Sequence, residues 1–147
     1  MATRRTARER AVQFLYHWDL NPAADIEPAL KLFWKQNPTP GQTRAYVKTL
    51  VTGVLEQRDQ LDAALREVAK NWEISRMGVV DRNILRLAVY EMLHCPDIPP
   101  VVSVNEGLDL AKYFCSRESG RFVNGLLDKV CQGLTRPHRE AAGGGAD

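Results

Sequence analysis

The sequence predicts an all-α protein of about seven helices, and three observations support this fold class. Apolar residues recur at the 3.6-residue spacing of α-helices through most of the 147 residues. Apolar and polar residues do not alternate over any stretch long enough for a β-strand. Segments rich in proline, glycine or polar residues interrupt the helical pattern and mark the connections between helices.

The first helix is expected over residues 7–18. Thr6 and Glu9 have the spacing of a capping box, in which two side chains satisfy backbone N–H groups at a helix start. An earlier start, capped by Thr3, is the alternative. With the later start, the first two arginines form an arm before the helix. Its expected apolar face comprises Ala7, Ala11, Phe14, Leu15 and Trp18.

Three further helical segments follow, and the apolar periodicity weakens between them. Asp25 is expected to cap a short helix that ends before Pro38, because a residue preceding proline avoids helical backbone angles. A longer helix starts near Gln42. After a polar break at residues 56–60, the pattern resumes as a second helix or as a bent continuation, with Asp59 as a candidate cap. The expected core residues are Leu30, Leu32, Phe33, Trp34, Val47, Leu50, Val51, Val54, Leu55, Leu61, Leu65, Val68 and Trp72.

The second half of the chain predicts three further helical segments. Residues 79–94 form the most apolar one, which is expected at the centre of the fold. Three prolines exclude a helix at residues 95–100. Ser103 and Glu106 form a second capping box and predict a helix start, and residues 115–120 are the next break. The last helix is expected to pack through Val123, Leu126, Leu127, Val130 and Leu134.

One helical domain is expected over residues 1–134, followed by a disordered tail at residues 135–147, which lacks apolar periodicity. The net charge is only +2, so a nucleic-acid surface has to come from a local basic cluster. No apolar run reaches the ~18 residues of a membrane span. The N-terminus lacks the apolar core of a secretory signal, and we therefore expect a cytoplasmic protein without a membrane contact.

Motifs for catalysis or cofactor binding do not occur in the sequence. It lacks the glycine-rich phosphate loop, the dinucleotide-binding turn and the nucleophile elbow. The three histidines and three cysteines are too widely spaced to indicate a metal site or a disulfide framework. We therefore expect no enzymatic activity, no cofactor and no metal.

Glu91 is an unusual carboxylate, because it lies within an apolar helix face. Its neighbours on that face are Val80, Ile84, Leu87 and Ala88. A buried carboxylate protonates unless it has partners. One interpretation is a general acid or base. The favoured one is a structural latch that accepts hydrogen bonds from backbone N–H groups or an arginine, since no second catalytic group is in sight.

The opening stretch, RRTARERAVQFLYHW at residues 4–18, holds four arginines and one acid before an aromatic run. One interpretation is a solvated helix start. The other is a surface for an anionic partner, because arginines bind the phosphates of single-stranded RNA and aromatic side chains stack on its bases. Tyr16 lies on an outer stripe of the helix, which favours the second interpretation.

The sequence resembles the NusB family in this opening helix and in three later segments. These are DRNILRLAVYEML (residues 81–93), DIPPVVSVNEGLDLAKYF (residues 97–114) and RFVNGLLDKV (residues 121–130). The resemblance implies two packed helical subdomains and a bacterial transcription antitermination factor. Such factors pair with NusE, a protein of the small ribosomal subunit, and bind single-stranded boxA RNA, especially in ribosomal RNA leaders. Other Nus factors and RNA polymerase join the complex, and no catalysis or cofactor is implied.

The resemblance also implies two binding surfaces. The expected RNA contacts are Arg4, Arg5, Arg8, Gln13, Tyr16, Arg117, Glu118, Arg121 and Phe122. Glu118 is an acid on that surface and is expected to weaken or tune the affinity. The expected NusE contacts are Asp81, Arg76 and Arg82, although the helix dipole alone would also favour an acid at Asp81. In the alternative interpretation of the RNA surface, the arginines are solvated and the aromatic residues pack on the core.

Two other functions stay open. A NusB-like domain also forms the RNA-binding N-terminal part of certain ribosomal RNA methyltransferases, although this chain holds no α/β cofactor domain. The second alternative is a helical homo-oligomer without an RNA role. Monomers and homodimers are both compatible with the resemblance, and a homodimer can cover the RNA surface.

Overall fold

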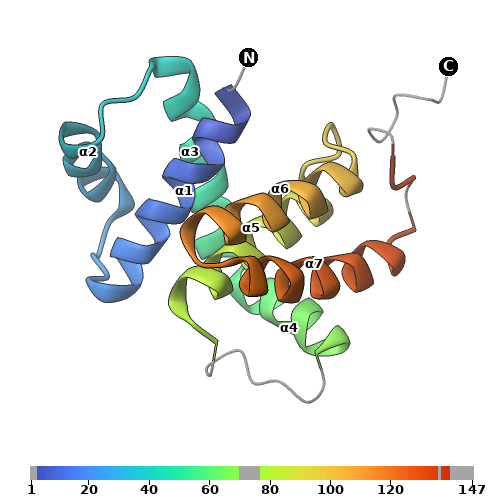
Figure 1. The fold of residues 1–147 in the computed structure, drawn as a ribbon. Helices are drawn as coiled ribbons and strands as arrows, with labels where there is room; N and C mark the ends of the chain where they lie inside the picture. Colours follow the sequence, from blue (N-terminus) through green and yellow to red (C-terminus); the bar gives the residue numbers. More distant parts are fainter. Residues whose placement is uncertain (1–2, 70–76, 136, 140–147) are drawn as a thin grey trace, which may run out of the picture.

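The computed structural model describes residues 3–69, 77–135 and 137–139, and within these ranges it contains helices and no strand. The expected all-α class is confirmed (Figure 1). The described residues form seven helices, α1 (Thr3–Leu20), α2 (Ile26–Gln36), α3 (Gly41–Glu56), α4 (Arg58–Val68), α5 (Val79–His94), α6 (Pro100–Phe114) and α7 (Arg117–Gln132).

Helix α5 lies at the centre, as its apolar sequence predicted. It contacts α1, α3, α4, α6 and α7, and residues 83–89 are buried without interruption. Helices α1 to α3 gather on one side of α5, and α6 and α7 pack together on the other (Figure 1). A single cluster of buried apolar side chains runs through both groups, so the two groups share one core.

Helix α1 begins earlier than the capping box predicted. It is already helical at Thr3, so Thr6 and Glu9 lie inside the helix and do not cap it. The early start fits the alternative expectation, although Thr3 is itself helical and is not the cap expected there. Its physical reason is tertiary, because Arg4 and Arg5 make ion pairs with carboxylates far along the chain that hold the first turn in place.

The second predicted capping box is wrong, because α6 begins before it. The helix begins at Pro100, within the segment whose prolines were expected to exclude a helix. Proline is tolerated there because the first helical turn does not need its N–H. Ser103 and Glu106 therefore lie inside the helix, where they bond to Glu91 and Arg5 instead of the helix start.

The connections agree with the sequence at some points and differ at others. Asp25 caps α2 as predicted, by accepting a hydrogen bond from the N–H of Glu27. Separate helices α3 and α4 replace the bent-helix alternative, but Gln57 rather than Asp59 occupies the cap position. Leu32 is 58% exposed and does not belong to the core.

The end of the described chain is attached to α6. The backbone carbonyl of His138 accepts a 2.8 Å hydrogen bond from the N–H of Val101. The prediction of a disordered tail falls, for residues 136 and 140–147, outside the described residues. No described helix is both long enough and apolar enough to cross a membrane.

Candidate nucleic-acid interface

The first two arginines of α1 face acidic side chains rather than open solvent. Arg4 lies 3.2 Å from a carboxylate oxygen of Asp97, and its guanidinium sits 4.2 Å from the ring centroid of Tyr46. Arg5 donates to both oxygens of Glu106, at 3.1 and 2.6 Å, and to Asp109 at 2.8 Å. These hydrogen bonds raise the pKa of Arg5. Both arginine side chains stay about half exposed, so phosphates reach them only in competition with the acids.

Arg8 does not belong to an accessible RNA surface, although the sequence predicted it there. It is only 5% exposed, and its Nε donates a 2.8 Å hydrogen bond to Glu91. A second guanidinium nitrogen lies 3.4 Å from Glu106. A phosphate has no access to a buried guanidinium that is already paired with carboxylates. The expectation that Arg8 contacts RNA is therefore corrected.

Glu91 is 1% exposed and is surrounded by donors from three other helices. One carboxylate oxygen accepts from Arg8 on α1 and from the hydroxyl of Tyr46 on α3, both at 2.8 Å. The other accepts from the hydroxyl of Ser103 on α6 at 2.9 Å. Burial, followed by the charge of Glu91, raises the pKa of Tyr46. The sequence suggested backbone N–H groups or an arginine; the arginine is Arg8, and two hydroxyl groups take the place of the backbone N–H groups.

The outer stripe of α1 borders a shallow apolar groove. Tyr16 is 38% exposed, and its ring meets His17 edge to face at 5.8 Å between centroids. Gln13 accepts a hydrogen bond from Arg10 at 3.1 Å. The groove has a volume of about 280 Å³ and is lined by Val12, Gln13, Tyr16, His17, Val80 and Phe114. Its apolar walls and exposed aromatic edge can accept a planar ring.

The start of α7 presents the second group of expected RNA residues. Ser116 caps this helix by accepting from the N–H of Ser119 at 3.0 Å. Arg117, Glu118 and Arg121 are exposed, and none of them has an ion pair within the described part of the chain. A hollow of about 260 Å³ lies beside them, lined by Met77, Gly78, Asp81, Ser116, Glu118, Ser119 and Phe122.

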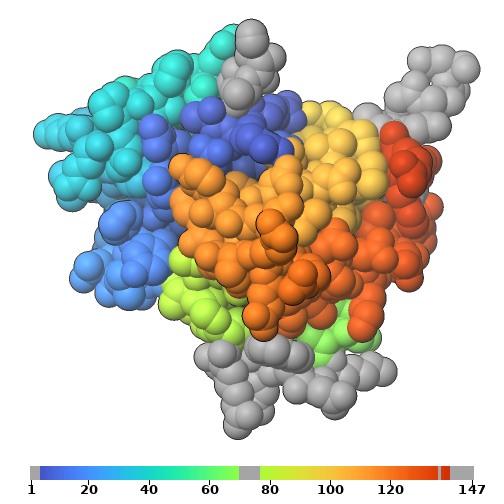
Figure 2. All heavy atoms as spheres, in the orientation of Figure 1, coloured from blue at the N-terminus to red at the C-terminus, as the bar shows by residue number. Residues whose placement is uncertain are grey.

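The start of α5 brings these two groups together. Val80 lines the groove beside Tyr16, and the next residue, Asp81, lines the hollow beside Phe122. Figure 2 shows the atoms of α1 and of the α6–α7 segment side by side on one face of the molecule. Tyr16 on α1 and Phe122 on α7 therefore border two hollows that meet at the start of α5.

Among the expected NusE residues that the structure describes, Asp81 borders the hollow at the start of α7. Asp81 accepts hydrogen bonds from the thiol of Cys115 at 3.3 Å and from the hydroxyl of Ser119 at 3.2 Å. It shares its hollow with Glu118, which was assigned to RNA. Arg82 lies 3.7 Å from Asp19 and is 18% exposed, so little of its side chain is available to a partner. Arg76 lies outside the described residues.

The thiol beside Asp81 has an altered acidity. Partial burial and the hydrogen bond to Asp81 raise the pKa of Cys115 to about 11. The thiol therefore stays protonated at neutral pH and acts as a hydrogen-bond donor. Within the described ranges, no group of three or more histidine, cysteine or acidic residues could hold a metal ion.

Sequence reasoning missed the acids that hold the arginines. Asp97 in the α5–α6 connection pairs with Arg4, and Glu106 and Asp109 on α6 pair with Arg5. The available signal was the spacing of Glu106 and Asp109, which places two acids on one helix face. It indicated an acidic stripe, but the packing of α6 beside α1 was needed to identify its partner.

Sequence relatives match almost the whole chain. The NusB family matches residues 5–132. The transcription antitermination protein NusB of Anaeromyxobacter dehalogenans is 46% identical over 141 residues, which cover 95% of this chain and 98% of that protein. The protein of the same name from Desulfatibacillum aliphaticivorans is 42% identical over 130 residues, covering 88% of this chain and 90% of that protein. These relatives are named for transcription and not for a reaction, in agreement with the expectation that the chain is not an enzyme.

Solved structures show the same arrangement of helices. NusB from T. maritima has a TM-score of 0.81 at 29% identity, with 90% of this chain and 93% of that chain covered. A crystal structure of antitermination factors NusB and NusE in complex with double-stranded RNA contains a chain with a TM-score of 0.80 at 29% identity, with 91% of this chain and 99% of that chain covered. With its family match over residues 5–132 and relatives of 42% and 46% identity, this chain belongs to the NusB family.

Proposed function

We propose that this protein is a transcription antitermination factor that pairs with NusE and binds single-stranded boxA RNA, in support of ribosomal RNA transcription. The observation that carries the proposal is its likeness to a NusB chain solved with NusE and RNA, over 91% of this chain. The name shared by its relatives favours this function over a methyltransferase domain or a homo-oligomer without an RNA role. Further Nus factors and RNA polymerase would join through the complex.

The proposed RNA surface follows the groove of α1 and the start of α7. Tyr16 supplies an exposed ring for stacking, and Gln13 supplies a polar group beside it. Arg117 and Arg121 supply exposed cations for phosphates, with Glu118 between them as a tuning acid and Phe122 at the edge of the hollow. Arg4 and Arg5 join this surface only when RNA displaces Asp97, Glu106 and Asp109.

The proposed NusE surface lies at the start of α5, around Asp81. Asp81 adjoins the RNA hollow, so RNA and NusE would meet across this carboxylate. Binding of either partner would then order side chains that the other also uses. Such coupling is reciprocal, so RNA and NusE should tighten each other's binding by the same factor.

The test is a titration of labelled boxA RNA with the protein alone and with NusE added. We expect weak binding by the protein alone and tighter binding with NusE. A scrambled single strand and a double-stranded RNA serve as controls, and boxA should bind more tightly than either. Equal affinity for boxA with and without NusE would contradict the cooperative part of the proposal, and equal affinity for the scrambled strand would contradict its specificity.

A further inference from the structure

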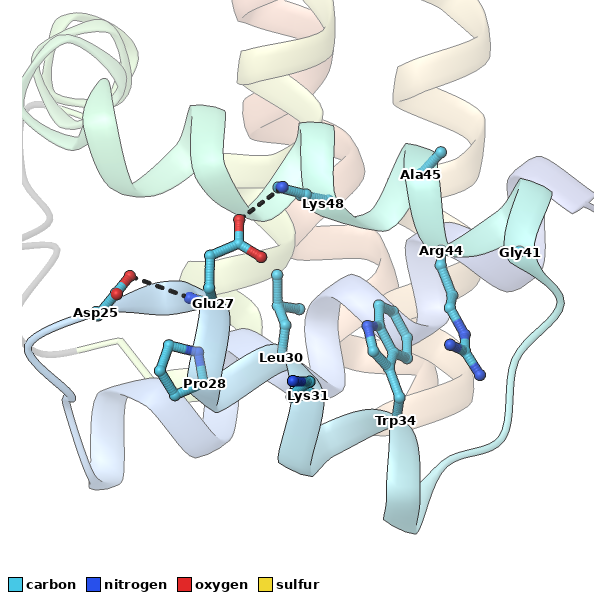
Figure 3. Close-up of a pocket in the computed structure, with 10 residues that line it drawn as sticks. All are labelled: Asp25, Glu27, Pro28, Leu30, Lys31, Trp34, Gly41, Arg44, Ala45 and Lys48. Atoms are coloured by element: carbon cyan, nitrogen blue, oxygen red, sulfur yellow. Dashed lines mark hydrogen bonds and ion pairs between the residues drawn. The ribbon is translucent and has the colours of Figure 1, made fainter.

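A wide groove between α2 and α3 lies outside the surface proposed above. It has a volume of about 590 Å³ and is lined by Asp25, Glu27, Pro28, Leu30, Lys31, Trp34, Gly41, Arg44, Ala45 and Lys48. Figure 3 shows α2 along one side of the groove and α3 along the other, with Leu30 and Trp34 pointing into the space between them. The groove is thus built mainly from α2 and α3, whereas the proposed RNA surface is built from α1 and α7.

Cations dominate the free charges of this groove. Glu27 is neutralised by Lys48, whose Nζ lies 2.6 Å from its carboxylate, and this pair bridges α2 and α3 (Figure 3). Asp25 is turned to the backbone, where it caps α2. Lys31 and Arg44 are exposed and have no carboxylate partner within the described part of the chain. Asp25 keeps its carboxylate charge, so the groove lining holds three cations against two acids, and this net positive charge suits an anionic ligand.

An aromatic ring lies next to these cations. The guanidinium carbon of Arg44 is 5.4 Å from the ring centroid of Trp34, which is half-buried and borders the groove. Leu30 is 3% exposed and forms an apolar floor beside the indole. An indole beside a guanidinium and a lysine matches how single-stranded nucleic acid is held, with bases stacked on rings and phosphates on cations.

The groove is connected to the proposed RNA surface by consecutive hydrogen bonds. Gln13, on the edge of the α1 groove, accepts from Arg10 at 3.1 Å. Arg10 donates to the hydroxyl of Thr39 at 3.2 Å, and the carbonyl of Thr39 accepts from Arg44 at 2.7 Å. The side chains of Arg10 and Arg44 thus link the proposed RNA surface on α1 to Trp34.

We propose that the α2–α3 groove is a second binding site for single-stranded RNA, which takes nucleotides that flank the segment held by α1 and α7. A base stacks on Trp34, and Lys31 and Arg44 contact the neighbouring phosphates. This proposal rests on the proposed function, because the flanking nucleotides belong to the same RNA. It predicts that RNA outside the recognised element adds affinity.

The test compares boxA RNA alone with boxA RNA extended by an unstructured single strand at either end. The wild-type protein should bind one extended RNA more tightly, with a steeper dependence on salt. In Lys31→Ala/Arg44→Ala, this advantage should disappear, and the slope of log affinity against log salt for the extended RNA should fall by roughly 0.7 per lost phosphate contact. The matched control is Lys35→Ala/Arg66→Ala, which removes the same charge from exposed positions outside the groove and should keep the advantage.

A second variant blocks the groove without removing a packed side chain. A Cβ on Gly41 meets no atom within 4 Å, and Gly41 is the first residue of α3, where an acid suits the helix dipole. Gly41→Glu should therefore keep the melting temperature, lower the affinity for the extended RNA and leave that for boxA alone unchanged.

The outcomes separate this inference from the proposed function. If the wild-type protein binds neither RNA, even with NusE, the proposed function fails. If boxA binds but extension adds nothing, or if the groove variant and its control behave alike, the second site is overturned and the proposed function stands. An acidic peptide serves as a further probe. Binding of that peptide, lost in Gly41→Glu while the extended RNA still binds, would also overturn the second site in favour of a protein partner.

Discussion

The Nε of Arg8 donates a 2.8 Å hydrogen bond to Oε2 of Glu91, and both side chains are more than nine-tenths buried. The pair joins α1 to α5, and Tyr46 and Ser103 attach α3 and α6 to the same carboxylate. A buried ion pair costs desolvation, which hydrogen bonds to its remaining lone pairs offset. Here all of these donors meet on a single acid.

The first prediction concerns the loss of this acid. Glu91→Ala should lower the free energy of unfolding by up to about 3–5 kcal/mol, because it leaves the buried charge of Arg8 with only the longer 3.4 Å contact to Glu106. Glu91→Gln should cost less, since the amide oxygen still accepts from a hydroxyl. Chemical denaturation of both variants checks this order. A Glu91→Ala variant as stable as wild type would contradict the structural role of the carboxylate.

A double variant tests whether the pair acts as a unit. In Arg8→Met/Glu91→Met, no buried charge is left over, so the loss of stability should be smaller than the sum of the losses in the two single variants. If the losses in the free energy of unfolding were additive, Arg8 and Glu91 would not interact in solution.

This cluster shows what the sequence could and could not predict. The burial of Glu91 followed from its place on an apolar helix face, and the central position of α5 followed from the same pattern. Its partners did not follow, because local spacing does not reveal which helices pack together. Ser103 and Glu106 have capping-box spacing, yet their side chains bond to α5 and α1. A hydrogen-bonding side chain in a helix can serve either its own backbone or another helix, and only tertiary packing decides.

The same limit applies to the arginine-rich opening. Counting four arginines against one acid suggested an unpaired basic surface. The acids that balance them lie about a hundred residues away, on α6 and just before it. Periodicity placed Tyr16 on an outer stripe, which agrees with its exposure of 38%. Exposure of a helix stripe is a local property, whereas the pairing of charges is not.

The second prediction concerns competition for Arg5. If RNA displaces the acids, Asp109→Asn should raise the affinity for boxA RNA, because it removes one rival of the phosphate. Exposed ion pairs contribute about 0.2–1 kcal/mol, so the gain should be at most about fivefold. Fluorescence anisotropy checks the affinity. The matched control is Asp128→Asn, an exposed acid on α7 whose one hydrogen bond within the described residues is with Gln132. Equal gains in both variants would indicate a general charge effect, and no gain would show that RNA does not use Arg5.

The third prediction uses the raised pKa of Cys115. Because this pKa is about 11, alkylation of the exposed thiol should be slow at pH 8 and should accelerate only as the pH approaches 11. Asp81→Asn removes the acceptor's charge, so it should lower the pKa and speed alkylation at pH 8. Mass spectrometry of the labelled peptide measures both rates. A wild-type profile with its midpoint near 9 would contradict the raised pKa, which burial and the hydrogen bond to Asp81 produce together.

The raised pKa of Cys115 also determines how the stability of the protein changes with pH. The pKa of Cys115 is higher in the folded protein than the ordinary value of 9, so the folded state favours the protonated thiol. Its contribution is fully present below pH 9 and is lost as the pH rises toward 11. In Asp81→Asn this alkaline loss should be smaller.

The fourth prediction compares two glycines in α6 and α7. A Cβ on Gly107 would lie 2.5 Å from a methyl carbon of Leu127, where the two helices approach closely. Gly107→Ala should therefore destabilise the protein by about 1–3 kcal/mol through overpacking. A Cβ on Gly125 meets nothing within 4 Å, so Gly125→Ala should add up to about 1 kcal/mol of helix propensity. The melting temperature should fall in Gly107→Ala and rise in Gly125→Ala. Equal shifts would contradict the close approach of α6 and α7.

The last prediction returns to the groove beside α1. Tyr16 exposes its ring next to Gln13 and Phe114, so a stacked base would lose about 1–3 kcal/mol of binding free energy in Tyr16→Ala. Tyr16→Phe keeps the ring and should bind boxA RNA almost as well as wild type. Stacking involves no counterion release, so the salt slope should stay unchanged in both variants, whereas Arg121→Ala should flatten it by roughly 0.7. Tyr113→Ala is the control, because that ring is 73% exposed and lies outside the groove lining. Equal losses from Tyr16 and Tyr113, or wild-type binding by Tyr16→Ala in a variant that still binds NusE, would remove α1 from the RNA surface.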